Sequence, residues 1–237
     1  MTSGRRSTAA LSYVAGVSIA TVASALLLWR SEGPAASLVV LVVLTGLGML
    51  AHAYPVQGFR HQAYQVTLPF IVVAGAILNA WQLVTFIVLI HLAEQARVRR
   101  PLHIQWFNVC NYFLSAALAA TFYHRATALL PDGALGQVAA ALAASCTFVL
   151  LNRVLLAAVL WLARGLSPLA SGLFQPELLA ADLIIAWIAG PMLVLTLEAG
   201  PWMLLATAGP LLLARLALSA LLAQREEQVQ PVEARAA

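Results

Sequence analysis

Charged residues are scarce in this chain, and lysine is missing altogether. Only 9% of its 237 residues are charged, whereas soluble domains carry about 25% charged residues. All 13 basic side chains are arginines. So few charges could not cover a water-facing surface, which excludes an ordinary soluble domain. The rest of the composition is 62% hydrophobic with a mean hydropathy of +0.89, and it predicts a multi-pass membrane protein.

The motifs of common catalytic and metal sites are also missing. The sequence contains no HExxH, no GxSxG, no phosphate-binding GxxxxGK[ST] and no Cys-x-x-Cys. His91 and Glu94 form an H-x-x-E pair one helical turn apart, which could share one ligand, but the spacing is common and a polar pair at a helix end is favoured. Cys110 and Cys146 lie inside apolar stretches, as buried thiols do. We therefore predict a non-enzyme with no metal site, and the sequence identifies no cofactor.

Eight apolar segments follow one another along the chain, over residues 9–29, 35–53, 66–78, 81–95, 104–123, 138–162, 178–197 and 202–222. They predict an all-α fold, a polytopic membrane helical bundle over residues 9–224, between a short segment 1–8 and a disordered polar tail 225–237. The third and fourth segments are short. About 13 helical residues span only about 20 Å, less than the roughly 30 Å hydrocarbon core. We expect these two to form a tilted pair or a helical hairpin.

The arginines are unevenly divided between the two ends of the predicted bundle. Eight segments place both termini on one side of the membrane. That side receives Arg5, Arg6, Arg60, Arg97, Arg99, Arg100, Arg164 and Arg225, and the other receives Arg30 and Arg125. Cytoplasmic loops are enriched in arginine, so we expect a cell-membrane protein with both termini in the cytoplasm. The net charge of +4 therefore reflects orientation in the lipid bilayer, and no nucleic-acid partner is expected.

Several polar side chains fall within the apolar segments, where they are costly and are candidates for function. They are Glu94, Asn108, Asn111, Asn152, Arg153, Asp182 and Arg215. Two cations and two anions at similar depth predict the ion pairs Arg153–Asp182 and Glu94–Arg215, or the swapped pairs. The favoured interpretation is that these side chains form interhelical bonds with a purely structural role. The functional alternative is a ligand site, a proton site or a polar hinge. Asn108 and Asn111 lie three residues apart, so we expect both to face this network.

Four short stretches follow one another along the chain: "AYPV" before a polar stretch, "AEQARVRRP", "WFNVCNYFLSAALAATFY" and the closing "LLLARLALSALLAQREE". In this order they resemble the multi-helix membrane sensor region that precedes GGDEF or HD-GYP signalling domains in bacteria. The positions that match are Arg97, Arg99, Arg100, Phe107, Asn108, Leu151 and Asn152. The resemblance implies a module that senses a ligand or partner in the membrane and relays to the cytoplasm. We also expect the basic loop of Arg97, Arg99 and Arg100 to be the docking site of a protein partner.

The catalytic signatures of such signalling proteins do not occur in this sequence. We therefore expect a stand-alone relative of the sensor region, or a module whose cytoplasmic effector is a separate polypeptide. Two alternatives remain open. An accessory subunit would be recovered as a stoichiometric part of a larger membrane complex. A small-molecule carrier resembling the substrate-binding subunits of vitamin-uptake systems would co-purify with ATPases.

Overall fold

The computed structural model describes residues 3–30, 33–54, 56–57, 63–64, 66–211 and 213. Its helices are α1 (Ser3–Arg30), α2 (Leu38–Ala53), α3 (Leu68–Ile77), α4 (Ala80–Val98), α5 (Leu102–Thr127), α6 (Ala134–Arg164), α7 (Pro176–Trp187) and α8 (Ala189–Ala199). Residues 203–211 are also helical. Two-residue strands, β1 (Val56–Gln57) and β2 (Ala63–Tyr64), pair in the connection between α2 and α3. The all-α prediction is confirmed, and the predicted tail, Arg60 and Arg215 lie outside the described residues.

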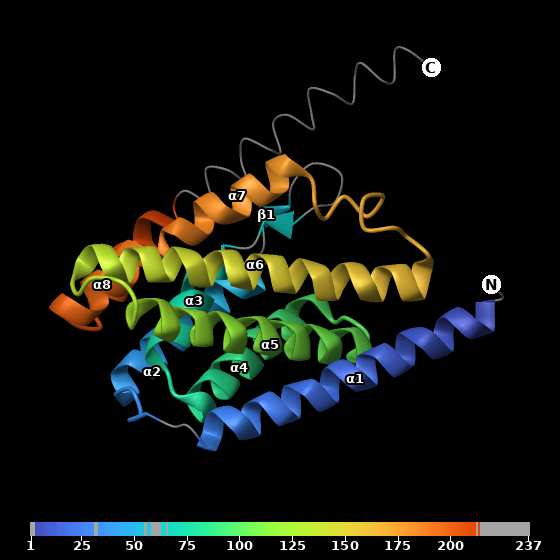
Figure 1. Cartoon of the computed structure of the whole chain (residues 1–237), viewed down its shortest axis with the longest axis horizontal. Coiled ribbons are helices and arrows are strands. Elements are labelled where there is room, and N and C mark those ends of the chain that lie inside the picture. The colour runs from blue at the N-terminus through green and yellow to red at the C-terminus, as the bar shows by residue number, and fades with distance from the viewer. Residues whose placement is uncertain are drawn as a thin grey trace, which may run out of the picture.

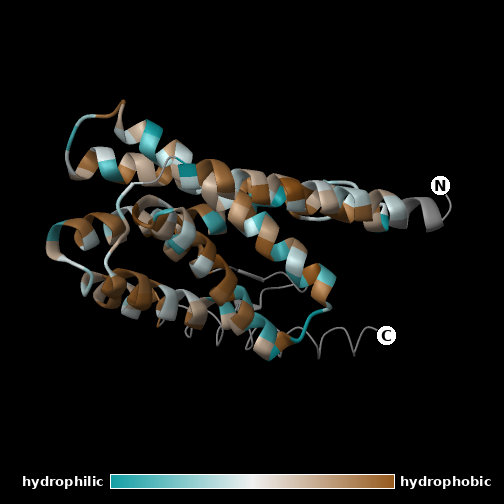
Figure 2. Cartoon of the chain, turned by 90° about the horizontal axis from the view of Figure 1, so that it is seen from below, coloured by the Kyte–Doolittle hydropathy of each residue, from teal (hydrophilic) through white to brown (hydrophobic). Residues whose placement is uncertain are grey.

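Three helices are long and apolar enough to cross a membrane. They cover Thr8–Arg30, Ala134–Arg164 and, with one interruption, Pro176–Ala199, while Leu38–Ala53 and Leu68–Ile77 are apolar but shorter. Figure 2 shows hydrophobic residues on the outward sides of the helices as well as between them. This composition fits a lipid environment, in which outward apolar side chains need no cover. The described structure thus establishes three candidate spans, fewer than the eight segments expected.

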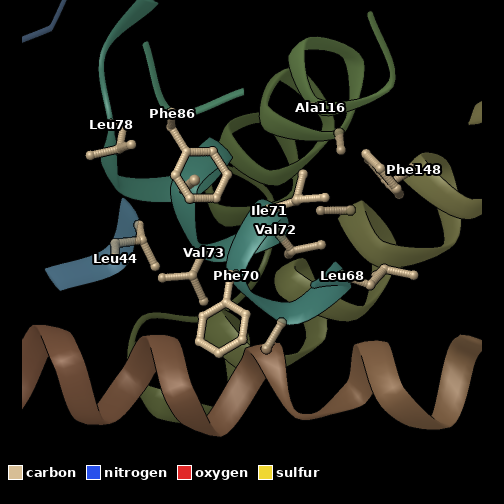
Figure 3. Close-up of a cluster of buried hydrophobic side chains, with 14 of the residues drawn as sticks. Leu44, Leu68, Phe70, Ile71, Val72, Val73, Leu78, Phe86, Ala116 and Phe148 are labelled. Carbon is tan, nitrogen blue, oxygen red and sulfur yellow. The ribbon is translucent and has the colours of Figure 1, made fainter. Parts of the chain in front are cut away.

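The short helix α3 lies in the centre of the bundle. Phe70, Ile71 and Val73 on it are fully buried, and Figure 3 shows its side chains pointing outward to residues of the surrounding helices, such as Leu44, Phe86 and Phe148. A helix that is hydrophobic on all sides is a core helix. At ten residues it is about 15 Å long, and it packs against protein rather than lipid. Burial within the bundle is what makes so short an apolar helix stable.

Local sequence explains how α3 is followed by α4. Asn79 accepts a hydrogen bond from the backbone of Gln82, and the Gln82 side chain accepts one from the backbone of Asn79, which forms a capping box. The Gln82 amide also bonds to both backbone groups of Ala36, in the segment before α2. Gly48 lets α2 approach α4 closely, because a Cβ there would lie 2.8 Å from Phe86. The predicted third and fourth segments are thus a tightly joined pair held against α2.

The predicted seventh segment is divided in the structure. α7 ends at Trp187, Ile188 forms a turn and α8 begins at Ala189. Pro191 lacks the N–H that would bond to Trp187, and its ring collides with that carbonyl in a regular helix. The predicted segment 178–197 lies within the candidate span Pro176–Ala199, and the proline divides the helix of this span at Ile188.

Helix α1 lies at the edge of the bundle, along α5 and α6 (Figure 1). It begins at Ser3, so it includes most of the segment 1–8 that the sequence places before the bundle. Among residues 8–30 of the helix, whose burial is described, only Val17 is buried, in a small cluster with Phe107 and Cys110 of α5. Tyr13 donates a hydrogen bond to the carbonyl of Leu155 in α6. This edge position leaves grooves on either side of α1.

Candidate functional site

The ends of α2, α4, α5 and α6 that meet near Arg97–Arg100 and Arg164 are called here the arginine-rich end. Successive helices run in opposite directions, so this end gathers the last turn of α2, the last turns of α4 and the first turns of α5. Half of the polar side chains that are buried among the described residues lie in these turns or close to them. They include His52, Thr67, His91, Glu94, Gln105 and Asn111.

Glu94 is the centre of a first buried cluster. Its Oε1 lies 3.0 Å from Nη2 of Arg100, and its Oε2 lies 3.6 Å from Nε2 of His52. Gln105 donates to Glu94 Oε2 at 3.5 Å and to the carbonyl of His91 at 2.8 Å. The Glu94 side chain is 9% exposed, so it lies close to two cationic or potentially cationic groups in surroundings that screen charge poorly.

Two histidines pack against each other beside this carboxylate. The rings of His52 and His91 lie 4.5 Å apart, and Tyr112 of α5 contacts both rings edge-on, at 5.3 Å and 4.7 Å between centroids. His52 Nδ1 lies 3.2 Å from the hydroxyl of Thr67, and His91 Nδ1 donates to the carbonyl of Ile87 at 2.9 Å. Three helices, α2, α4 and α5, therefore each contribute a ring to one stack. We refer to His52, His91, Glu94 and Tyr112 as the histidine cluster.

Some buried polar atoms in and beside the histidine cluster lack a hydrogen-bond partner among the described residues, as do atoms elsewhere, such as Nε of Arg153. His91 is 1% exposed, yet its Nε2 has no hydrogen-bond partner among the described residues. The same holds for Oε1 of Gln105, whereas Nε2 of His52 lies 3.6 Å from Oε2 of Glu94. An unmade bond at a buried polar atom costs about 1–3 kcal/mol. Such atoms are satisfied in proteins by a bound water, an ion or a ligand.

A second cluster joins α6 to α7. Arg153 Nη2 lies 2.5 Å from Oδ2 of Asp182, so the first of the predicted ion pairs is present. Arg153 also donates to the backbone carbonyls of Leu173 and Leu178, which precede and begin α7. The two charged side chains are 7% and 13% exposed. This cluster fixes the connection after α6 to α7, and its carbonyl contacts are those of a structural clamp.

The two asparagines of α5 have different surroundings. Asn111 is buried, donates to the carbonyl of Asn152 at 3.4 Å and accepts from Ser115 at 3.5 Å. Asn108 is partly exposed and lines a groove beside α1. Among the described residues Asn108 makes no side-chain hydrogen bond, whereas Asn111 contacts Asn152 of α6. That Asn108 joins the network stays a prediction, because Arg215 lies outside the described residues.

Glu94 has partners other than the two arginines, Arg215 and Arg153, with which the sequence predicts it to pair. The structure provides Arg100 and His52, while Arg215 is outside the described residues. Arg99 explains how Arg100 reaches Glu94, because it ends α4 in the left-handed conformation (φ 52°, ψ 51°) and turns the chain back over the helix.

The histidine cluster could be recognised from the sequence only in part. The pair His91 and Glu94 is visible as an H-x-x-E spacing, but nothing local identifies His52 and Tyr112. A useful signal is that His52 and His91 both end apolar segments that run to the same side. Within the described residues, no group of three or more histidines, cysteines or carboxylates is arranged to hold a metal ion.

Comparisons with protein-family models, with curated proteins and with solved structures found no match to this chain.

Proposed function

We propose that this chain is a non-catalytic membrane module that responds to a ligand or partner and relays the response to a separate cytoplasmic effector. The observation that supports it is the continuous set of contacts from the buried histidine cluster to the basic loop. His52 and His91 contact each other, His52 lies beside Glu94, and Glu94 pairs with Arg100. A change in the charge or position of the cluster would therefore act on the loop directly.

The basic loop consists of Arg97, Arg99 and Arg100, and its three side chains are engaged differently. Arg97 donates to the carbonyl of Ala53 at 2.9 Å and stacks over the ring of Tyr54 at 4.0 Å. Arg100 pairs with Glu94. Arg99 is exposed and makes no ion pair or side-chain hydrogen bond with another described residue. Arg99 is thus the side chain of the loop best placed to bind an acidic surface on an effector.

Sidedness and segment number belong to the same proposal. We take the arginine-rich end to be cytoplasmic and the chain to have about eight membrane-embedded segments with both termini in the cytoplasm, following the arginine distribution. A reporter enzyme fused after Ala237 and one inserted beside Asp132, between α5 and α6, test it. We expect the reporter after Ala237 to show a cytoplasmic position and the reporter beside Asp132 to show a position on the outer side of the membrane. The opposite pattern would contradict the orientation.

The experiment on function is a quantitative native pull-down of the full-length chain from its own membranes. Arg99→Asn removes the charge but keeps a residue that tolerates the left-handed conformation. We expect a cytoplasmic signalling protein to be recovered with the wild type and lost with Arg99→Asn. Arg30→Gln, which removes an arginine from the other end, is the matched control and should keep the partner.

The pull-down also separates the alternatives. Recovery of ATPase subunits in place of a signalling protein would indicate a small-molecule carrier. Stoichiometric recovery with respiratory or photosynthetic subunits would indicate an accessory subunit. Either result would contradict the proposed relay. The resemblance to sensor regions before GGDEF and HD-GYP domains favours the signalling protein.

A further inference from the structure

A groove of about 490 Å³ opens between α1, α5 and α6 at the arginine-rich end. Its walls are mostly apolar and include Val14 of α1, Phe107 of α5 and Leu156 and Leu160 of α6. The N-terminal end of α1 lies beside the C-terminal end of α6 there (Figure 1). Small-molecule sites typically have volumes of roughly 300–1,000 Å³. The groove is separate from the histidine cluster, on the opposite side of α5.

Three polar side chains meet the apolar walls of this groove. His103 lies in the first turn of α5, Asn108 lies further along the same helix, and Arg164 is the last residue of α6. No acidic side chain is among the described residues that line it. Arg164 forms no ion pair, and Asn108 no side-chain hydrogen bond, with another described residue. The groove thus offers a cation, an imidazole and an amide, none of which has an ion pair or side-chain hydrogen bond with another described residue.

We propose that this groove binds an anionic phospholipid from the leaflet at the arginine-rich end. The phosphate would be bound by Arg164 and His103, and Asn108 would hydrogen-bond to an ester or glycerol oxygen. The parts of the acyl chains nearest the glycerol would lie along Phe107, Leu156 and Leu160. Basic pockets between membrane helices attract anionic headgroups, and the apolar walls suit a chain but not a free inorganic anion. A zwitterionic lipid would gain less, because its own cation would meet Arg164.

Native mass spectrometry of the delipidated full-length chain tests this proposal. The protein in detergent is titrated with dioleoyl phosphatidylglycerol or with dioleoyl phosphatidylcholine. We expect preferential binding of one phosphatidylglycerol, and about a fivefold loss of its affinity in Arg164→Gln, the effect of one arginine near a phosphate. Arg164→Lys should retain most of the affinity. Arg30→Gln, at the other end of α1, should change it less than twofold.

A second variant tests the groove without removing a charge. Ala10 of α1 lines the groove, and Ala10→Phe should fill part of it and weaken binding of both lipids, while thermal unfolding shows that the variant is folded. Equal affinity for the two lipids in the wild type would overturn the proposal. So would unchanged phosphatidylglycerol binding in both Arg164→Gln and Ala10→Phe. Neither result would bear on the relay, because its test depends on Arg99 and on partner recovery.

Discussion

The ion pair of Arg153 and Asp182 gives the sharpest prediction about stability. Asp182→Ala leaves the guanidinium buried, with only the carbonyls of Leu173 and Leu178 as acceptors. Removing one partner of a buried pair costs about 3–5 kcal/mol in soluble proteins. We expect the lower value, about 3 kcal/mol, because the two carbonyls remain bonded. For a chain of this length, that loss corresponds to a fall in Tm of roughly 6–12 °C.

The double variant Arg153→Met with Asp182→Leu separates a structural clamp from a functional pair. Replacing both charges by apolar side chains of similar size often costs little. Here it also removes the donor for two carbonyls, and each lost bond costs about 1 kcal/mol. We therefore expect a loss of about 1–2 kcal/mol for the double variant, smaller than for Asp182→Ala alone.

Both values are measured on the full-length chain in detergent, from tryptophan fluorescence during heating and during titration with sodium dodecyl sulfate. The argument would be refuted if the double variant lost as much stability as Arg153→Met and Asp182→Leu lose together as single variants. An Asp182→Ala variant of wild-type stability that no longer recovers a partner would show that the pair serves function rather than structure.

Three further predictions concern other parts of the bundle. Gly48→Ala should be less stable than Gly46→Ala by about 1–3 kcal/mol, because a Cβ at position 48 overlaps Phe86 whereas the one at position 46 meets nothing within 4 Å; thermal unfolding of both variants checks it. His91→Phe should stay within about 1 kcal/mol of wild-type stability, because removal of the buried Nε2 that lacks a partner offsets the loss of the Nδ1 hydrogen bond to Ile87. The variant should nevertheless lose the signalling partner. Arg99→Gly should stabilise the chain by about 1 kcal/mol, because glycine adopts the left-handed conformation without strain, and it should also lose the partner; equal stability to the wild type would count against the strain.

The sequence predicts the helices and one of the ion pairs because both depend on information local to a segment. Depth along an apolar run places Arg153 opposite Asp182, and the structure joins them. The all-α class follows from composition in the same way. The boundaries of the two long helices α5 and α6 contain the predicted ranges for a similar reason, since each is one uninterrupted apolar stretch.

The histidine cluster depends on contacts between segments, which composition does not encode. His52 meets His91 only because Gly48 allows α2 and α4 to approach closely. Arg100 reaches Glu94 only because Arg99 adopts a left-handed conformation. The apolar pattern places His52 and His91 at segment ends on the same side, but it predicts neither contact. The central place of α3 is likewise set by the helices around it, and its sequence shows only that it is short and apolar throughout.

Partner recovery with His91→Phe and Arg99→Asn, beside the control Arg30→Gln, tests the proposed relay most directly. The three variants are first matched to the wild type by thermal unfolding in detergent, and each is then used in the same native pull-down. The relay predicts that one cytoplasmic signalling protein is recovered with the wild type and Arg30→Gln and is lost with His91→Phe and Arg99→Asn. Equal recovery of that protein with all four chains would contradict it.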